Sequence, residues 1–260
     1  MSAGGSCVFR RRSGKRRAGA GRLCREDRRS WTVRRWRRWA AALPYTGTEG
    51  SASAISFPGS ATGCLMSAVL RSQRPAHGGR DPGKVAVNQT EEKDLNLEIA
   101  LKLKNQLEKK GITVVMTRET DAGLYEENAQ NKQVQDLQRR CQLIQDTGPA
   151  CAVSIHQNSY SDESVKGAQV FYYRSSAKGQ ELAEQIQAAL REYADPDNKR
   201  EAKGAATYYM LKNTAVPLVI VECGFLSNWE EAELLKEEAY QNTLAEAVAE
   251  GIGNYLEKKA

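Results

Sequence analysis

Helical repeats and short apolar runs alternate along residues 91–257, and this alternation restricts the folds that the chain can adopt. The first repeat places Leu95, Ile99, Leu103 and Leu107 four residues apart and stops at Gly111. Such spacing predicts a helix with one buried face and a glycine end. Further helices are predicted around residues 134–144, 182–193 and 240–255, and strands at residues 112–117, 151–156, 167–173 and 217–222. We therefore expect an α/β fold, a mainly parallel sheet flanked by helices on both faces.

Residues 1–74 differ in composition from the rest of the chain. They carry 16 Lys and Arg against three acidic residues, a net charge of +13, whereas the other 186 residues carry 22 against 29, a net charge of −7. An Arg-rich segment without regular apolar patterning cannot bury enough surface to offset the entropy of ordering. We predict a disordered or spurious Arg-rich extension over residues 1–74 and a single domain over residues 75–260. No recognition fold accompanies the arginines, so neither a nucleic-acid partner nor membrane contact through this segment is expected.

The six cysteines show neither a CxxC pair nor a regular spacing. A domain of 186 residues can bury a sizeable core without a disulfide framework, and zinc ribbons need paired cysteines. We therefore expect dispersed free thiols.

Three side chains, two at strand ends and one in a loop, are candidates for chemistry. His156 and Glu222 end predicted strands, and ligands of such sheets bind beyond the carboxyl ends of the strands. His77 opens a turn-forming run of Gly, Asp and Pro, which would leave its imidazole exposed. An acid without a partner after a run as apolar as residues 217–221 would be costly, which favours a functional role for Glu222.

Four short blocks contain these side chains, in a fixed order along the chain. They are HGGRDPG at residues 77–83, EKDLNL at 92–97, SIHQNS at 154–159 and VECGFLSN at 221–228. Together they resemble the signature blocks of zinc-dependent N-acetylmuramoyl-L-alanine amidases, over residues 75–257. The resemblance implies a zinc hydrolase that cuts the amide between N-acetylmuramic acid and L-alanine in peptidoglycan.

The resemblance also assigns roles to individual residues. It implies that His77, Glu92 and His156 bind one Zn²⁺ and that Glu222 is the catalytic carboxylate. Glu91 is adjacent to Glu92, but the Glu-Lys-Asp order selects Glu92. Two imidazoles and a carboxylate leave a fourth position on zinc for water, as in catalytic sites, and zinc lowers the pKa of that water to about 7.

Other reactive or charged side chains are expected to be structural. With both histidines assigned to the metal, Cys223 has no nearby base and is predicted to be a buried thiol, not a nucleophile. Arg118, Arg139 and Arg140 could contact an acidic peptide or glycan, although solvated structural charges are the expected reading.

Several further segments look most like sporulation-specific and germination-specific amidases, among them residues 136–140, 167–173 and 208–211. This resemblance implies action on spore cortex peptidoglycan and an extracytoplasmic location, in the cell wall or spore envelope. The Arg-rich start is not followed by the apolar stretch of a recognisable signal peptide. The core is too short for an appended wall-binding repeat, so targeting would come from the domain itself or from an accessory protein.

The residues before His77 depart from the family pattern. The family has an apolar strand leading directly into Asp-Pro-Gly-His, whereas here Val69 and Leu70 are followed by a polar stretch with Arg74 in place of the Asp. We therefore expect an eroded first strand. A catalytically impaired, wall-binding homologue is the alternative function.

Overall fold

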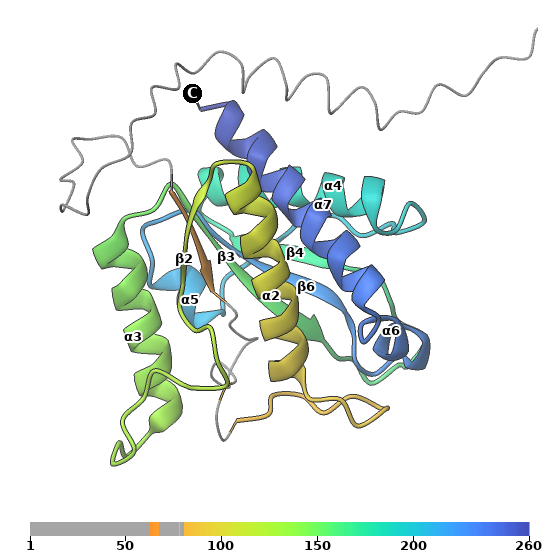
Figure 1. The fold of residues 1–260 in the computed structure, drawn as a ribbon, viewed down its shortest axis with the longest axis horizontal. Coiled ribbons are helices and arrows are strands. Elements are labelled where there is room, and N and C mark those ends of the chain that lie inside the picture. The colour runs from red at the N-terminus through yellow and green to blue at the C-terminus, as the bar shows by residue number, and fades with distance from the viewer. Residues whose placement is uncertain (1–62, 68–77, 79–80, 260) are drawn as a thin grey trace, which may run out of the picture. The chain divides into compact units, whose positions relative to one another are not determined.

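The computed structural model describes residues 63–67, 78 and 81–259 of the chain. Figure 1 shows their helices and strands. In chain order the elements are β1 (Gly63–Ser67), α2 (Glu92–Lys109), β2 (Thr113–Met116), α3 (Lys132–Thr147), β3 (Cys151–Asn158), β4 (Gln169–Tyr173), α4 (Ala177–Tyr193), β5 (Lys203–Ala205), α5 (Tyr209–Lys212), β6 (Leu218–Phe225), α6 (Trp229–Leu234) and α7 (Glu238–Glu257).

The strands of the described part of the chain form one six-stranded sheet in the order β2-β1-β3-β6-β4-β5. Neighbouring strands run parallel except β4 and β6, which are antiparallel. The mainly parallel sheet expected from the alternating pattern is therefore confirmed.

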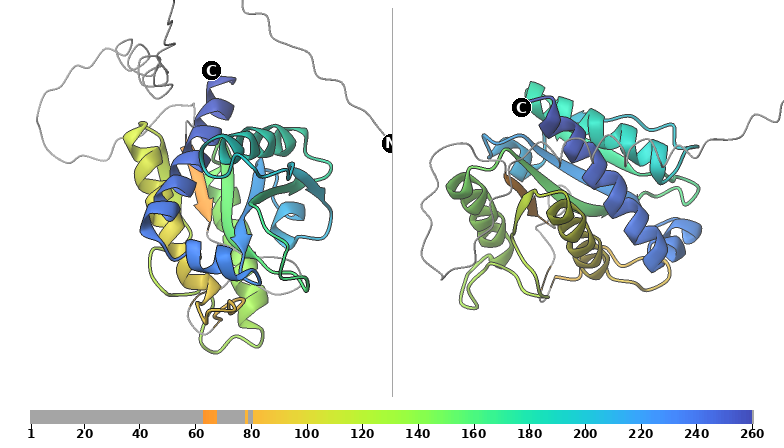
Figure 2. Two further views of the ribbon diagram at one scale, coloured as in Figure 1. Left: turned by 90° about the vertical axis from the view of Figure 1, so that its right-hand side faces the viewer. Right: turned by 45° about the horizontal axis from the view of Figure 1, so that its top comes forward.

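Helices cover both faces of this sheet. Figure 1 shows α2 and α7 across one face and α5 behind the sheet, and Figure 2 shows α4 beside α7. Alternate residues of β3 divide between two cores: Cys151, Val153 and Ile155 join the core under α2, α4 and α7, whereas Ala152 joins the core under α3 and α5. Because strand side chains alternate, His156 lies on the same face of β3 as Ala152.

The helix ends follow from their sequences. The apolar residues that predicted α2 are at most 2% exposed. Asn131 begins α3 by accepting a hydrogen bond from Val134 N, and Gly148, in the left-handed conformation, ends it. Ser176 caps α4 in the same way through Gly179 N. These side chains satisfy backbone groups that a helix end leaves without partners.

One strand lies within the segment that sequence analysis assigned to the extension. β1 occupies Gly63–Ser67 and pairs in parallel with both β2 and β3, so it is an interior strand of the sheet. It precedes Val69 and Leu70, where the eroded strand was expected. The remainder of residues 1–74 lies outside the described residues, and the boundary after residue 74 stays a prediction.

Candidate metal and catalytic site

The carboxyl ends of β3 and β6 bring His156 and Glu222 side by side. The two residues are direct partners in the parallel register of these neighbouring strands. Both side chains are 0% exposed. Because paired residues of adjacent strands point to the same face, the imidazole and the carboxylate lie on the α3 and α5 side of the sheet. The register continues into β4, where Gln169 pairs with Glu222.

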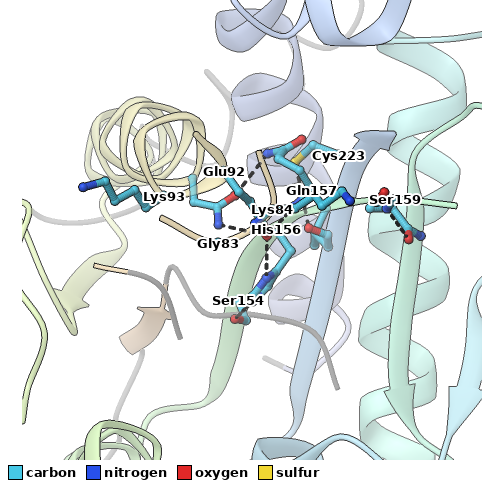
Figure 3. Close-up of polar contacts among 12 residues, drawn as sticks. Gly83, Lys84, Glu92, Lys93, Ser154, His156, Gln157, Ser159 and Cys223 are labelled. Carbon is cyan, nitrogen blue, oxygen red and sulfur yellow. Dashed lines mark hydrogen bonds and ion pairs between the residues drawn. The ribbon is translucent and has the colours of Figure 1, made fainter. Parts of the chain in front are cut away.

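Glu92 reaches the same place from the first turn of α2. Its Oε1 lies 3.4 Å from His156 Nδ1, and the side chain is 1% exposed. Three donors hold the carboxylate: Lys84 N to Oε2 at 3.1 Å, Gln157 N to Oε1 at 3.2 Å and Asn96 Nδ2 to Oε1 at 3.3 Å. Backbone and side-chain N–H groups therefore fix Glu92 against the end of β3 (Figure 3).

The other side of the His156 ring meets a hydroxyl. Nε2 of His156 lies 2.9 Å from Ser154 Oγ, so both ring nitrogens have polar neighbours. Figure 3 shows Glu92, His156 and Ser154 in one run of contacts, with Lys93 pointing away. Ser154 was missed in the sequence analysis, although its position two residues before His156 places it on the same face of the strand. Asn96, one helical turn after Glu92, could have been found by the same kind of spacing.

Glu91 and Glu92, neighbours in sequence, have different surroundings. The Glu91 side chain is 41% exposed and lies 3.3 Å from Lys93 Nζ. The structure therefore brings Glu92 to His156 and leaves Glu91 at the surface, which agrees with the Glu-Lys-Asp order used to choose between them.

His77 lies outside the described residues, but its neighbour Gly78 is described. Gly78 N donates to Asp81 O at 3.0 Å, and Asp81 N donates to Gly78 O at 3.4 Å. A Cβ atom at Gly78 would lie 2.9 Å from the carbonyl oxygen of Ala122, closer than real Cβ contacts allow. Only glycine therefore fits at the second position of the first block.

The donor chemistry of Glu92 and His156 suits a zinc ion. Zinc sites in proteins commonly combine imidazole nitrogen with carboxylate oxygen. Burying ionisable groups costs free energy unless an opposite charge or a metal ion compensates for the lost hydration. Among the residues that the structure describes, no group of three His, Cys, Asp or Glu side chains has a metal-binding arrangement.

Cys223 and the arginines have structural surroundings. Burial raises the pKa of the Cys223 thiol, so it stays protonated, as expected for a buried thiol. Cys141 and Cys223 are buried free thiols. The prediction of solvated arginines was wrong for two of three. Arg140 is 0% exposed and pairs with Asp136 at 2.6 Å, and Arg118 is 6% exposed and donates to the carbonyl oxygen of Lys93 at 2.6 Å. Arg139 pairs with Glu126 at the surface.

Comparisons with known proteins identify the family of this chain. Residues 74–254 match the protein family described as N-acetylmuramoyl-L-alanine amidase. This chain belongs to the N-acetylmuramoyl-L-alanine amidase family. The matched region holds Glu92, His156 and Glu222, so the site lies within the amidase domain. The chain is accordingly an enzyme of that family, whose substrate is peptidoglycan.

Several individual amidases are similar to this chain in sequence or structure. The amidase is 36% identical over 188 residues to the germination-specific N-acetylmuramoyl-L-alanine amidase of Bacillus subtilis, covering 71% of this chain and 78% of the relative. It is 30% identical to the probable cell wall amidase LytH of Staphylococcus saprophyticus, of which it covers 56%. Among solved structures, the CwlD amidase from Clostridioides difficile, determined in complex with the GerS lipoprotein, has a TM-score of 0.70 and 38% identity, covering 75% of this chain and 98% of that one.

The described helices of the amidase are too short or too polar to span a membrane. Within residues 63–67, 78 and 81–259, none combines the length and the apolar character needed to cross a bilayer.

Proposed function

We propose that this amidase hydrolyses the bond between N-acetylmuramic acid and L-alanine with one Zn²⁺ held by His77, Glu92 and His156, and with Glu222 as its general base and acid. The observation that supports this proposal is the buried pair of Glu92 and His156 at the end of β3, with Glu222 beside His156 in register. Zinc bound there would act as a Lewis acid and make water acidic near neutral pH.

The residues around the ligands prepare them before any metal arrives. The three N–H donors keep Glu92 Oε1 and Oε2 in fixed directions, and Ser154 restrains the His156 ring through Nε2. Hydrogen-bond partners of this kind orient metal ligands, and their loss typically lowers metal affinity by about 10-fold to 100-fold. Because Glu92 and His156 are already aligned, little freedom remains to be lost on binding.

Glu222 has the proton-transfer role in this proposal. Its carboxylate accepts a proton from the attacking water and delivers it to the nitrogen of L-alanine as the C–N bond breaks. Muramic acid then gains the oxygen as a free carboxyl group, and the peptide leaves with a free amine. A side chain that is 0% exposed keeps bulk water from competing for this proton.

We infer spore cortex peptidoglycan as the substrate, with activity outside the cytoplasm, from the likeness to a germination-specific relative. The Clostridioides difficile relative was solved with a lipoprotein bound, so we also propose that an accessory protein brings this amidase to its substrate.

Metal analysis combined with digestion of cortex and vegetative peptidoglycan tests the proposal. We expect one zinc per chain and the appearance of free L-alanine amino groups, faster from cortex material. Binding to peptidoglycan without release of any peptide would instead support the impaired, wall-binding homologue.

A further inference from the structure

The row of paired residues that contains the site extends one strand beyond Glu222. In strand order, His156 of β3, Glu222 of β6 and Gln169 of β4 lie in register across the sheet. The next two residues of β4 lie on opposite faces of the sheet: Val170 joins the core under α2, α4 and α7, and Phe171 joins the core under α3 and α5. Since side chains alternate along a strand, Gln169 points to the same side as Glu222 and His156.

Gln169 connects this row to an arginine. Its Oε1 accepts a hydrogen bond from Arg200 Nη1 at 3.4 Å, while its Nε2 donates to the Glu201 carbonyl oxygen at 2.9 Å. The guanidinium of Arg200 lies over the ring of Phe225, 4.7 Å from the ring centre, and Phe225 follows Glu222 on β6 by three residues. Two separate contacts therefore hold Arg200 at the end of the strand that carries the catalytic carboxylate.

The Arg200 guanidinium is held in one orientation with donor capacity left over. Its Nε donates to the Lys166 carbonyl oxygen at 2.8 Å, and its backbone N–H donates to Asn198 Oδ1 at 2.9 Å. A guanidinium has five N–H donors, of which the contacts with Lys166 and Gln169 use two. None of the ion pairs within 4.0 Å among the described residues includes Arg200, and its side chain remains partly exposed.

A nearby acid, Glu231, is already engaged with the backbone. Its Oε1 accepts from Gly167 N at 2.9 Å and its Oε2 from Phe225 N at 2.8 Å. Burial raises the pKa of Glu231, an effect that the two backbone donors and the charge of Arg200 partly offset. Arg118 and Arg140, in contrast, are buried and donate to carbonyl, hydroxyl and carboxylate groups of the fold. Of these three arginines, Arg200 is the one whose side chain is partly exposed, so a ligand from solvent can reach its remaining donors.

We propose that Arg200 binds a free carboxylate of the stem peptide that leaves with L-alanine. This inference rests on the proposed function of Glu222. A group that protonates the leaving amine must lie beside the departing peptide, so the peptide extends on the Glu222 side of the metal ligands. Arg200 lies on that side, away from His156 in strand order. A preorganised guanidinium suits a carboxylate because its planar N–H pairs match the two oxygens.

Two synthetic substrates test this role: a muramoyl peptide whose residue after L-alanine has a free carboxylate, and the same compound with a carboxamide there. The wild-type enzyme is expected to prefer the carboxylate substrate. Arg200→Gln should raise KM for it by about 10-fold to 100-fold, the worth of a charge-assisted hydrogen bond, and leave KM for the carboxamide and kcat for both nearly unchanged. Arg200→Lys should recover part of the preference.

Arg174→Gln is the matched control, because Arg174 is an exposed arginine directly after β4. It should leave the preference intact. A loss in Arg200→Gln that is equal for both substrates would overturn the inference and assign Arg200 a structural role, as would unchanged kinetics. Failure of the wild-type enzyme to cleave either substrate would instead contradict the proposed function, so the two failures are distinguishable.

Discussion

Ser154 shows how much of the site depends on single hydrogen bonds. Its hydroxyl is the neighbour of His156 Nε2, while Glu92 lies at Nδ1. If the Nδ1 side of the ring faces the metal, Ser154 fixes the tautomer from the opposite side. Asn96 and Gln157 hold Glu92 through hydrogen bonds to its carboxylate, and Gln157 Nε2 also donates to Asn96 Oδ1 at 3.2 Å. The two proposed zinc ligands are therefore held by a buried polar network in which each member restrains the next.

Replacing Ser154 with alanine should weaken zinc binding without unfolding the domain. We expect a loss of about 10-fold to 100-fold in zinc affinity, because the His156 ring loses the group that orients it. Competition with a chromogenic chelator measures this affinity. Ser164→Ala, at an exposed loop residue, is the control and should change nothing. Equal affinities for wild type and Ser154→Ala would mean that Ser154 does not orient the ligand.

The helices and strands with strong patterns could be predicted from the sequence, and the weakly patterned ones could not. The leucine repeat of α2 and the apolar runs of β3 and β6 lie where they were expected, because each has one dominant periodicity. β1 reads Gly-Cys-Leu-Met-Ser and β5 is only three residues long, so neither has a β-branched run. Tertiary pairing rather than local propensity makes these two segments strands.

The same distinction applies to the site. His156, Glu222 and Glu92 could be singled out from the motif blocks, and their places at strand and helix ends followed from the fold. The buried roles of Arg118 and Arg140 could not be predicted, because their partners Lys93, Asp136 and Thr117 come from other elements of the fold or from one turn along α3. The sequence offers no sign that an arginine will be enclosed by such partners.

The contact between α4 and α7 depends on a glycine. A Cβ atom at Gly251 of α7 would lie 2.4 Å from Ile186 Cα of α4, whereas one at Gly253 meets nothing within 4 Å. Gly251→Ala should destabilise the fold by about 1–3 kcal/mol through overpacking. Gly253→Ala should stabilise it by about 1 kcal/mol, since alanine favours a helix more than glycine does. Urea unfolding checks both, and destabilisation by Gly253→Ala or none by Gly251→Ala would contradict the close packing.

At the scale of the whole molecule, composition and sheet pairing give different starting points for the amidase domain. Residues 1–62 and residues 63–74 belong together by composition, yet Gly63–Ser67 form an interior strand. An interior strand satisfies backbone groups of two neighbours, so its removal leaves both β2 and β3 without partners along that edge. The amidase domain therefore needs residues that the sequence pattern assigned elsewhere.

Two truncations separate these requirements. Removing residues 1–62 should leave zinc binding and thermal unfolding of the amidase nearly unchanged, because β1 is retained. Removing residues 1–74 should lower Tm markedly or prevent folding, because β1 is lost. Calorimetry with metal analysis measures both quantities. Equal stability of the two truncated proteins would show that β1 contributes nothing to the sheet.

We propose that Glu222 transfers the proton in a zinc-dependent reaction, and one paired measurement tests this role most directly: zinc content and the rate of L-alanine amine release from peptidoglycan in Glu222→Gln. We expect one zinc per chain and a rate lower by about 10²-fold to 10⁴-fold, or about 2.7–5.4 kcal/mol of barrier. His156→Ala should lose the metal, and Glu230→Gln, at an exposed residue, should match wild type. A Glu222→Gln enzyme that keeps its zinc and works at nearly the wild-type rate would contradict the claim.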